Sequence, residues 1–363
     1  READGRGNGE TDAGETYLIA AADLEAMDKA DGTEDGGIDL THVQNGAASY
    51  RFVGADGDDE AGVSVSSAGD VDEDGKADLL IGALWADGIG NGKNKSGETY
   101  LIAAADLEAL DKADGTEDGV IDLTHVQNGT ASYRFVGAGA WDYSGFSVSS
   151  AGDVDGDGKT DLLIGARWAD GIGNGEYGAG ETYLIAAADL VALDKADGTE
   201  DGVIDLGNVQ NGAASYRFIG ADRENFSSHS VSSAGDVDGD GYVDLLIGAP
   251  YADATDNGKS YAGEAYLIAA ADLVALDKAD GAEDGVIDLA NVQNGAGSYR
   301  FNGADTYEIA GQTVSSAGDV DGDGKIDLLI GAYRADGIDD NEHDAGETYL
   351  ISGADLEALD AAD

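Results

Sequence analysis

The chain has 363 residues, with 75 Asp or Glu against 19 Lys or Arg, which gives a formal net charge of −56 at pH 7. This charge excludes nucleic-acid binding through phosphate contacts and disfavours an anionic membrane surface. The absence of cysteine excludes disulfides and thiol chemistry, and no run of 18 apolar residues is present that could span a membrane. Because the chain begins at Arg1 rather than Met, we expect a mature product or a piece of a longer protein.

One sequence unit recurs with a period of 83 residues. The stretch SSAGDVD begins at Ser66, Ser149, Ser232 and Ser315, and YLI begins at Tyr17, Tyr100, Tyr183, Tyr266 and Tyr349. A constant period predicts an array in which each unit packs on its neighbours. We expect one array over 1–363, with a partial unit over 1–61, blades over 62–144, 145–227 and 228–310, and a partial unit over 311–363.

Each unit is expected to contain four short strands. Residues 146–150 (FSVSS) alternate apolar and small polar side chains, as strands do, and 161–166 (DLLIGA) form an apolar run that suits a strand buried on both faces. Further strands are expected over 180–187 and 215–220, and between them Asp189 is a candidate N-cap for one or two helical turns. This pattern predicts an all-β, propeller-type array of four-stranded blades with short helical insertions.

An acidic loop joins the first two strands of each unit. Within 153–161, aspartates stand at positions 1, 3, 5 and 9, while Gly156 and Gly158 at positions 4 and 6 permit positive φ. The carboxylates and a backbone carbonyl near Lys159 can converge on Ca²⁺, which takes six to eight oxygen ligands. Position 12 is Ile164 and the flanks are strands, which excludes an EF-hand. The predicted ligands are Asp70, Asp72, Asp74, Asp78, Asp153, Asp155, Asp157, Asp161, Asp236, Asp238, Asp240, Asp244, Asp319, Asp321, Asp323 and Asp327.

The insertion carries a second acidic loop with three acids instead of four. In 114–122 the positions 1, 3, 5 and 9 hold Asp, Thr, Asp and Asp, and the last copy has Ala282 in place of the threonine. The loop is either a second ion site or a plain turn, so the chain is expected to bind four to eight Ca²⁺. The second candidate set is Asp31, Thr33, Asp35, Asp39, Asp114, Thr116, Asp118, Asp122, Asp197, Thr199, Asp201, Asp205, Asp280, Asp284 and Asp288. Bound cations would relieve the self-repulsion of so acidic a chain.

The stretch over 144–166 (SGFSVSSAGDVDGDGKTDLLIGA) resembles the FG-GAP repeat of integrin α-subunit propellers and of many bacterial surface proteins. Members of this family pair an FG and a GAP with a D-x-D-x-D-G-x-x-D calcium loop between the first two strands of a blade. The third copy keeps GAP at 248–250, whereas Leu84, Arg167 and Tyr333 replace the proline elsewhere. The resemblance implies a calcium-binding β-propeller. The family is mostly seven-bladed and this chain has material for about four blades, so a closed ring and an open array both remain as interpretations.

These features favour a calcium-stabilised, extracellular structural or adhesive module that is part of a larger surface protein or filament. The alternative is a receptor-like propeller that binds a protein or glycan on one face. For that reading Trp85, Trp168 and Tyr251, in the loop after the second strand, are candidate stacking residues, although they equally suit the cover of a blade edge. We expect an extracellular or cell-surface location, in a bacterium and in a saline environment.

Catalysis is not expected, because an active site is usually a single constellation, whereas here almost every polar cluster occurs four times. The histidines His42 and His125 share one repeat position, which later copies fill with Asn208 and Asn291, so that position does not require imidazole. The expected partners are calcium ions and either a cell-surface protein or glycan, or a second copy that pairs head to tail at an exposed strand edge. Nucleic acid and a membrane span are not expected.

Overall fold

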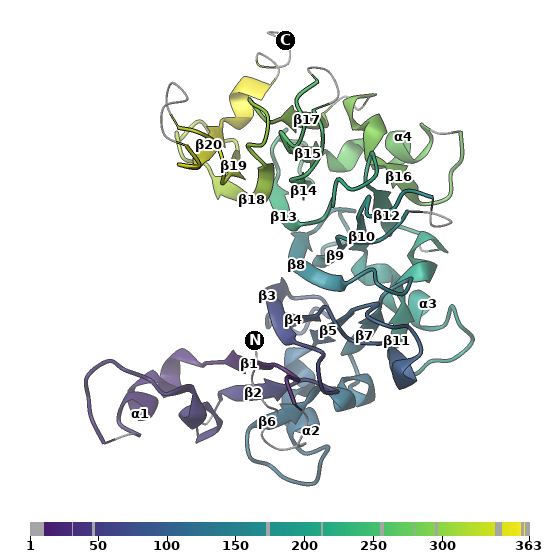
Figure 1. Ribbon diagram of the computed structural model, residues 1–363. Helices are drawn as coiled ribbons and strands as arrows, with labels where there is room; N and C mark the ends of the chain where they lie inside the picture. The colour runs from purple at the N-terminus through teal and green to yellow at the C-terminus, as the bar shows by residue number, and fades with distance from the viewer. Residues whose placement is uncertain are drawn as a thin grey trace.

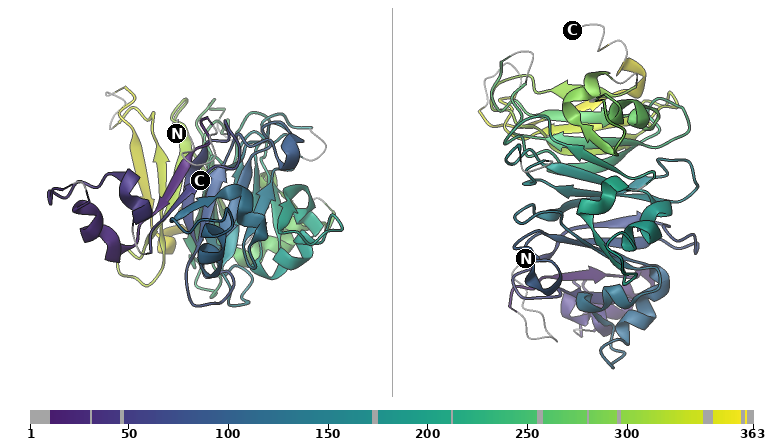
Figure 2. Two further views of the ribbon diagram at one scale, coloured as in Figure 1. Left: turned by 90° about the horizontal axis from the view of Figure 1, so that it is seen from below. Right: turned by 90° about the vertical axis from the view of Figure 1, so that its right-hand side faces the viewer.

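The computed structural model describes residues 11–30, 32–45, 48–171, 175–211, 213–254, 258–279, 281–294, 297–337, 343–356 and 359. Its strands form five sheets that follow one another along an open arc (Figure 1), and a second view shows them stacked from the N-terminal to the C-terminal end (Figure 2). Within the described residues, no helix combines the length and apolar character that a membrane crossing needs.

Three central sheets repeat one antiparallel arrangement in which the first four strands follow chain order. The first consists of β3 (Ala61–Gly69), β4 (Asp78–Ala83), β5 (Glu98–Ile102) and β7 (Tyr133–Val136). The second consists of β8 (Ser144–Gly152), β9 (Asp161–Ala166), β10 (Glu181–Ile185) and β12 (Tyr216–Ile219), and the third of β13 (Ser230–Gly235), β14 (Asp244–Ala249), β15 (Glu264–Ile268) and β17 (Tyr299–Asn302). The four strands predicted for each blade are thus confirmed, as is the β-rich, propeller-type fold.

The two end sheets are partial. The N-terminal sheet contains β1 (Glu15–Leu18), β2 (Tyr50–Val53) and β6 (Val120–Asp122), and the C-terminal sheet contains β18 (Ala310–Gly318), β19 (Asp327–Ala332) and β20 (Glu347–Ile351). The described chain therefore forms an open array, and no sheet joins its two ends.

An additional strand, absent from the sequence prediction, joins the N-terminal sheet and the first two central blades each to the next repeat. The strands β6, β11 (Val203–Asp205) and β16 (Val286–Asp288) come from the second acidic loops and pair in parallel with the outer strand of the preceding sheet. In the second of these pairs, Ile204 lies opposite Phe135, and both side chains are fully buried. The apolar Val-Ile pair between acidic residues was the only local signal for this strand, and its partner lies some 70 residues upstream.

Helical turns occupy the insertions, as predicted, on the outer side of the arc (Figure 1). They are α1 (Leu24–Asp28), α2 (Leu107–Asp111), α3 (Leu190–Asp194) and α4 (Leu273–Asp277), preceded by the 3₁₀ turns η1 (Ala21–Asp23), η4 (Ala104–Asp106), η7 (Ala187–Asp189) and η9 (Ala270–Asp272). Further 3₁₀ turns are η2 (Leu40–Asn45), η3 (Ile89–Asn91), η5 (Leu123–Asn128), η8 (Leu206–Asn211), η10 (Leu289–Asn294) and η12 (Gly353–Asp355).

Asp189 directly precedes α3, as predicted, but it does not cap the helix. Because η7 precedes α3, Asp189 already lies inside a helical turn, and its side chain makes no capping hydrogen bond. Its carboxylate accepts hydrogen bonds from the backbone N–H and the hydroxyl of Ser215, at 2.9 and 2.8 Å. Asp189 thus holds the start of the fourth strand against the insertion.

The first strands of neighbouring blades lie side by side along the inner side of the arc (Figure 1). The serines that alternate with apolar residues in these strands link one blade to the next. Ser64 Oγ accepts a hydrogen bond from the backbone N–H of Val148 at 3.0 Å, and Ser147 Oγ accepts one from Val231 N–H at 3.1 Å. The alternation predicted a strand, and the structure adds that its polar positions face the neighbouring blade.

Candidate metal centres

The first acidic loop brings together three of its four predicted ligands. Asp153, Asp155 and Asp161 each offer a carboxylate oxygen, and these oxygens lie within 4.8 Å of one another. The same grouping occurs in the other copies, as Asp70, Asp72 and Asp78, as Asp236, Asp238 and Asp244, and as Asp319, Asp321 and Asp327. Positions 1, 3 and 9 of the loop therefore converge in every repeat.

The loop is wrapped around its first aspartate. Asp153 accepts hydrogen bonds from the backbone N–H of Gly156 at 2.8 Å and of Gly158 at 3.0 Å. Gly156 has φ of +78°, a conformation that glycine adopts without strain, although the first copy places Glu73 there with φ of +62°. The two N–H groups curl the chain around the site, so the local sequence determines the convergence.

The ninth position anchors the loop to the rest of the blade. Asp161 accepts from Val154 N–H and from Ala187 N–H, each at 2.9 Å, so one carboxylate joins the loop to the first residue of η7. Burial, with the nearby charges of Asp155 and Asp157, raises the pKa of Asp161 to about 7, and burial raises that of Asp244 to about 6. Burial and neighbouring negative charges both disfavour the ionised form of this carboxyl group, and a bound cation would stabilise that form.

The fifth position differs from the expectation. Asp157 Oδ1 accepts a hydrogen bond from the backbone N–H of Lys159 at 2.8 Å, and Asp157 is not part of the convergent group. The equivalent aspartates bond to their own turn in the same way, namely Asp74, Asp240 and Asp323. The side chain at this position therefore shapes the turn in the structure as described.

The chemistry of the convergent group fits a hard cation. All of its donors are carboxylate oxygens, the ligands that Ca²⁺ and Mg²⁺ take. In the first copy, Asp70 Oδ1 is buried and has no hydrogen-bond partner in the described structure. A buried oxygen without a donor is unfavourable unless a cation or water satisfies it, so the residues present fit a bound divalent ion.

The second acidic loops do not converge in this way within the described residues. Asp114 Oδ1 accepts from the backbone N–H and the hydroxyl of Thr116, both at 2.8 Å, and Asp122 caps η5 through Thr124 N–H at 2.9 Å. The physical reason lies at position 6, where Gly119 N–H bonds to Asp111 of α2, at 2.8 Å, rather than to the first aspartate of the loop.

The other copies follow the same pattern. The N–H of Gly36, Gly202 and Gly285 bonds to Asp28, Asp194 and Asp277 respectively, while Asp39 and Asp288 accept from the second residue after them. Asp31 and Asp280 lie outside the described residues. The helix thus takes the glycine N–H that would have wrapped the loop around an ion, and the geometry favours turns over second ion sites.

The three candidate stacking residues lie where consecutive blades meet. Trp168 and Tyr251 both contact Phe226, with ring centroids 4.6 and 5.4 Å away, and Lys95 Nζ lies 3.9 Å from the centre of the Trp85 ring. These contacts match the interpretation that the rings cover blade edges. Sequence reasoning missed that two further exposed rings, Trp141 and Tyr177, join Trp168 in lining a hollow of about 260 Å³.

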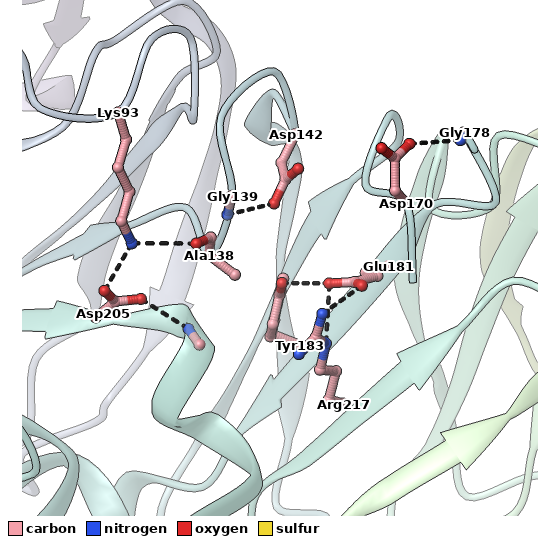
Figure 3. Close-up of polar contacts among 11 residues, drawn as sticks. Lys93, Ala138, Gly139, Asp142, Asp170, Gly178, Glu181, Tyr183, Asp205 and Arg217 are labelled. Carbon is pink, nitrogen blue, oxygen red and sulfur yellow. Dashed lines mark hydrogen bonds and ion pairs between the residues drawn. The ribbon is translucent and has the colours of Figure 1, made fainter. Parts of the chain in front are cut away.

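A buried charge cluster in the first and second central blades was also missed. In the second blade, Glu181 accepts from Arg217 Nε at 2.9 Å and from the Tyr183 hydroxyl at 2.5 Å (Figure 3). Glu98, Arg134 and Tyr100 repeat this arrangement in the first blade, with Arg134 Nε 2.8 Å from Glu98 Oε2. The three residues come from the third and fourth strands, so only the strand register, with Tyr100 opposite Arg134, brings them together.

Comparisons with known proteins agree with this architecture. The family described as FG-GAP repeat matches residues 61–102, 144–185, 229–268 and 310–351, each of which covers the first three strands of a blade and its convergent acidic loop. The chain is similar to integrin alpha-PS2 of Drosophila melanogaster, with 28% identity over 57% of this chain and 12% of the relative.

It is likewise similar to integrin alpha-PS5 of Drosophila melanogaster, with 31% identity over 56% of this chain and 16% of the relative. With integrin alpha-5 of Xenopus laevis the identity is 27% over 65% of this chain and 20% of the relative. The chain therefore spans a fifth or less of the length of these relatives. The resemblance seen in the sequence is confirmed, because the chain contains four FG-GAP repeats.

Proposed function

We propose that the chain is a calcium-stabilised structural and adhesive module of an extracellular or cell-surface protein. The observation that carries this proposal is the convergence of three aspartate carboxylates in each of four equivalent loops. The similarity to integrin alpha chains supports an adhesive role. The fourfold repetition of the acidic groups fits structural ion sites rather than a single active centre.

The contacts of the loops indicate what a bound ion would do. Asp153 O accepts a hydrogen bond from Val243 N–H of the next blade at 3.1 Å, and Asp161 holds Ala187 at the start of the insertion. An ion that fixes the loop would therefore stiffen both the blade and its junction with the following blade. Weak sites with a Kd of about 10⁻⁴–10⁻³ M suit extracellular modules, and their binding free energy adds directly to folding.

A melting experiment tests the proposal. The chain is stripped with a chelator, and its thermal unfolding is followed by circular dichroism. The Ca²⁺ concentration is about 5–10 mM, which exceeds the expected Kd of such sites. The comparison samples contain Mg²⁺ at the same concentration, or chelator with NaCl at matched ionic strength. We expect Ca²⁺ to raise the melting temperature well above the NaCl control. Mg²⁺ should restore less, because it requires a smaller octahedral site. If the melting curves in Ca²⁺ and in NaCl coincide, charge screening alone explains any stabilisation by Ca²⁺, and the proposal is refuted.

A second candidate function is recognition of a protein or glycan ligand at the aromatic hollow. The observation that favours it is that Trp141 and Tyr177, which line the hollow together with Trp168, are about half exposed. The ring of Trp141 meets that of Tyr143 edge to face, and the ring of Trp168 meets that of Tyr177 in the same way. Binding to a glycan array is measured for the native chain and for Trp141→Ala, with Tyr242→Ala as an exposed aromatic control. Loss of binding in the first variant alone, with melting temperatures unchanged, would support this function, whereas equal binding by all three chains would exclude it.

A further inference from the structure

The last blade has a hollow of about 370 Å³ between the segment that precedes β18 and the loop that follows β19. It occupies the same place in its repeat as the aromatic hollow of the second blade. Trp168, Asp170 and Tyr177 stand two periods before Arg334, Asp336 and His343. The two hollows therefore share a scaffold, but the lining has changed from aromatic rings to ionisable side chains.

Three of these ionisable side chains point their donor atoms at one place. Asp336, His343 and Asp344 each offer one potential metal ligand, and the ligand atoms lie within 4.8 Å of one another. His343 Nδ1 lies 2.9 Å from Asp336 Oδ1 and 3.8 Å from Asp344 Oδ1. This group combines an imidazole nitrogen with carboxylate oxygens, unlike the all-oxygen loops.

The backbone sets the position of Asp336. The residue eight places after it, Asp344, donates its N–H to Asp336 Oδ1 at 2.9 Å, and the equivalent bond occurs in the other three repeats, to Asp87, Asp170 and Asp253. The two residues that end this hydrogen-bonded loop differ between the repeats. They are a histidine and an aspartate in the last repeat, whereas the other repeats have Asn94-Lys95, Tyr177-Gly178 and Ser260-Tyr261. The scaffold is thus common to all repeats, and the ligand set belongs to one.

Glu308 provides an independent observation. It lines the same hollow, its side chain is 7% exposed, and its Oε2 is buried without a hydrogen-bond partner in the described structure. A buried carboxylate oxygen with no donor is strongly unfavourable and calls for a cation. Arg334 also lines the hollow, but its guanidinium lies over the ring of Tyr333, 5.4 Å from the centroid.

We propose that this hollow is a binding site for a divalent first-row transition metal ion such as Zn²⁺. His343 supplies the nitrogen ligand, Asp336 and Asp344 supply oxygen ligands, and Glu308 adds negative charge from the buried side of the hollow. Imidazole with carboxylates is a donor set that zinc takes, whereas Ca²⁺ is held by oxygen alone. The site is therefore distinct in chemistry from the four aspartate loops and does not depend on their occupancy.

Calorimetric titration tests the site. The chain is stripped with a chelator, dialysed into millimolar Ca²⁺ so that hard oxygen sites are saturated, and titrated with Zn²⁺. We expect one equivalent of tight Zn²⁺ binding, which His343→Ala weakens by at least about 10–100-fold, since even indirect partners of a metal ligand have effects of this size. His125→Ala is the matched control, because it removes an imidazole elsewhere and should leave the titration unchanged.

A second variant and a spectroscopic probe guard against misfolding. Glu308→Gln keeps the side-chain volume and should weaken Zn²⁺ binding while the melting curve in Ca²⁺ stays that of the native chain. Co²⁺ should give visible d–d absorption bands in the native chain that disappear in His343→Ala. Zn²⁺ binding that is equal in the native chain and His343→Ala, or Co²⁺ spectra that do not differ between them, would overturn the proposal.

Discussion

Lys93 Nζ lies 2.6 Å from Asp205 Oδ2 and also donates to the backbone oxygens of Gly137 and Ala138, at 3.0 and 3.2 Å (Figure 3). Lys93 belongs to the loop after the second strand of one blade, whereas Asp205 ends β11, which the next repeat contributes. The insertion that contains β11 thus reaches back to the preceding blade, where it adds a strand and is held by Lys93. This strap, defined as β11 with its contacts to β7 and Lys93, couples neighbouring blades.

The buried apolar side chain of the strap should contribute more to the free energy of unfolding than the ion pair does. Ile204 is fully buried, so we expect Ile204→Ala to lower the free energy of unfolding by about 2–5 kcal/mol. Chemical denaturation measures the loss, and hydrogen exchange should show faster exchange of the β7 amides. Val203→Ala, at a half-buried position of the same strand, is the control with a smaller effect. Unchanged exchange in β7 would contradict the coupling.

Lys93→Met should have a weaker effect on the same junction. The Lys93 and Asp205 side chains are 32% and 39% exposed, and ion pairs open to solvent contribute up to about 1 kcal/mol. We therefore expect the free energy of unfolding to fall by less than in Ile204→Ala, with a decrease in the effect as salt is raised. A loss as large as that of Ile204→Ala, insensitive to salt, would show that the lysine has a structural role beyond its charge.

Local patterns predicted most of the fold. Strands such as 161–166 and the turns near Asp189 follow from alternation, apolar runs and the fixed period, and the structure has them with nearly the same bounds. The strap could not be predicted, because three residues inside an acidic loop form a strand only when a distant edge strand accepts them in parallel. The same limit applies to the Glu98–Arg134 pair, which is 36 residues apart and depends on strand register.

The sequence predicted the first kind of acidic loop correctly but could not distinguish it from the second kind. Aspartate spacing predicted the convergence of positions 1, 3 and 9, because the glycine N–H groups that curl the loop lie within the same nine residues. The second loops have nearly the same spacing, yet Asp111, from the preceding helix, takes the decisive N–H of Gly119. Spacing alone therefore cannot distinguish an ion loop from a turn held by a neighbouring helix.

A pair of isosteric variants tests that distinction. Asp155→Asn removes one convergent carboxylate and should reduce the bound calcium by one equivalent, with a lower melting temperature in Ca²⁺ than the native chain. The matched variant Asp118→Asn, in the second loop of the preceding repeat, should leave both the calcium stoichiometry and the melting temperature nearly unchanged. Equilibrium dialysis gives the stoichiometry, and equal losses in the two variants would mean that both loops bind calcium.

The stability of the first blade should fall as pH rises from about 4 to 7. Burial, followed by the charge of Glu98, raises the pKa of Asp59 to about 7, from 3.8 in an unperturbed side chain. The folded state therefore holds a proton that the unfolded state has released. The contribution of Asp59 to the free energy of unfolding is most favourable below pH 3.8, where the carboxyl group is protonated in both states. It is lost as the pH rises from 3.8 to about 7, by up to about 1.4 kcal/mol per pH unit.

Asp59→Asn should remove this part of the pH dependence, because the amide keeps the polar oxygen but does not titrate. The measurement is the free energy of unfolding of each chain between pH 4 and 8 in saturating Ca²⁺, so that the other acidic groups contribute equally to both. Asp56→Asn, at an exposed position three residues earlier, serves as the control. If the native chain and Asp59→Asn show the same slope, the carboxyl group of Asp59 is ionised in the folded state.

The buried ion pair of the first blade should be more sensitive to loss of one partner than of both. Glu98 is fully buried and receives two hydrogen bonds from Arg134, at 2.8 and 2.6 Å. Arg134→Met leaves that carboxylate without its cation, so we expect a loss of about 3–5 kcal/mol in the free energy of unfolding. Adding Glu98→Gln removes the stranded charge and should recover part of this loss, since neutral replacements of buried pairs are often tolerated. A double variant less stable than Arg134→Met alone would mean that Glu98 stabilises the blade through Tyr100, whose hydroxyl also donates to it at 2.5 Å, rather than through Arg134.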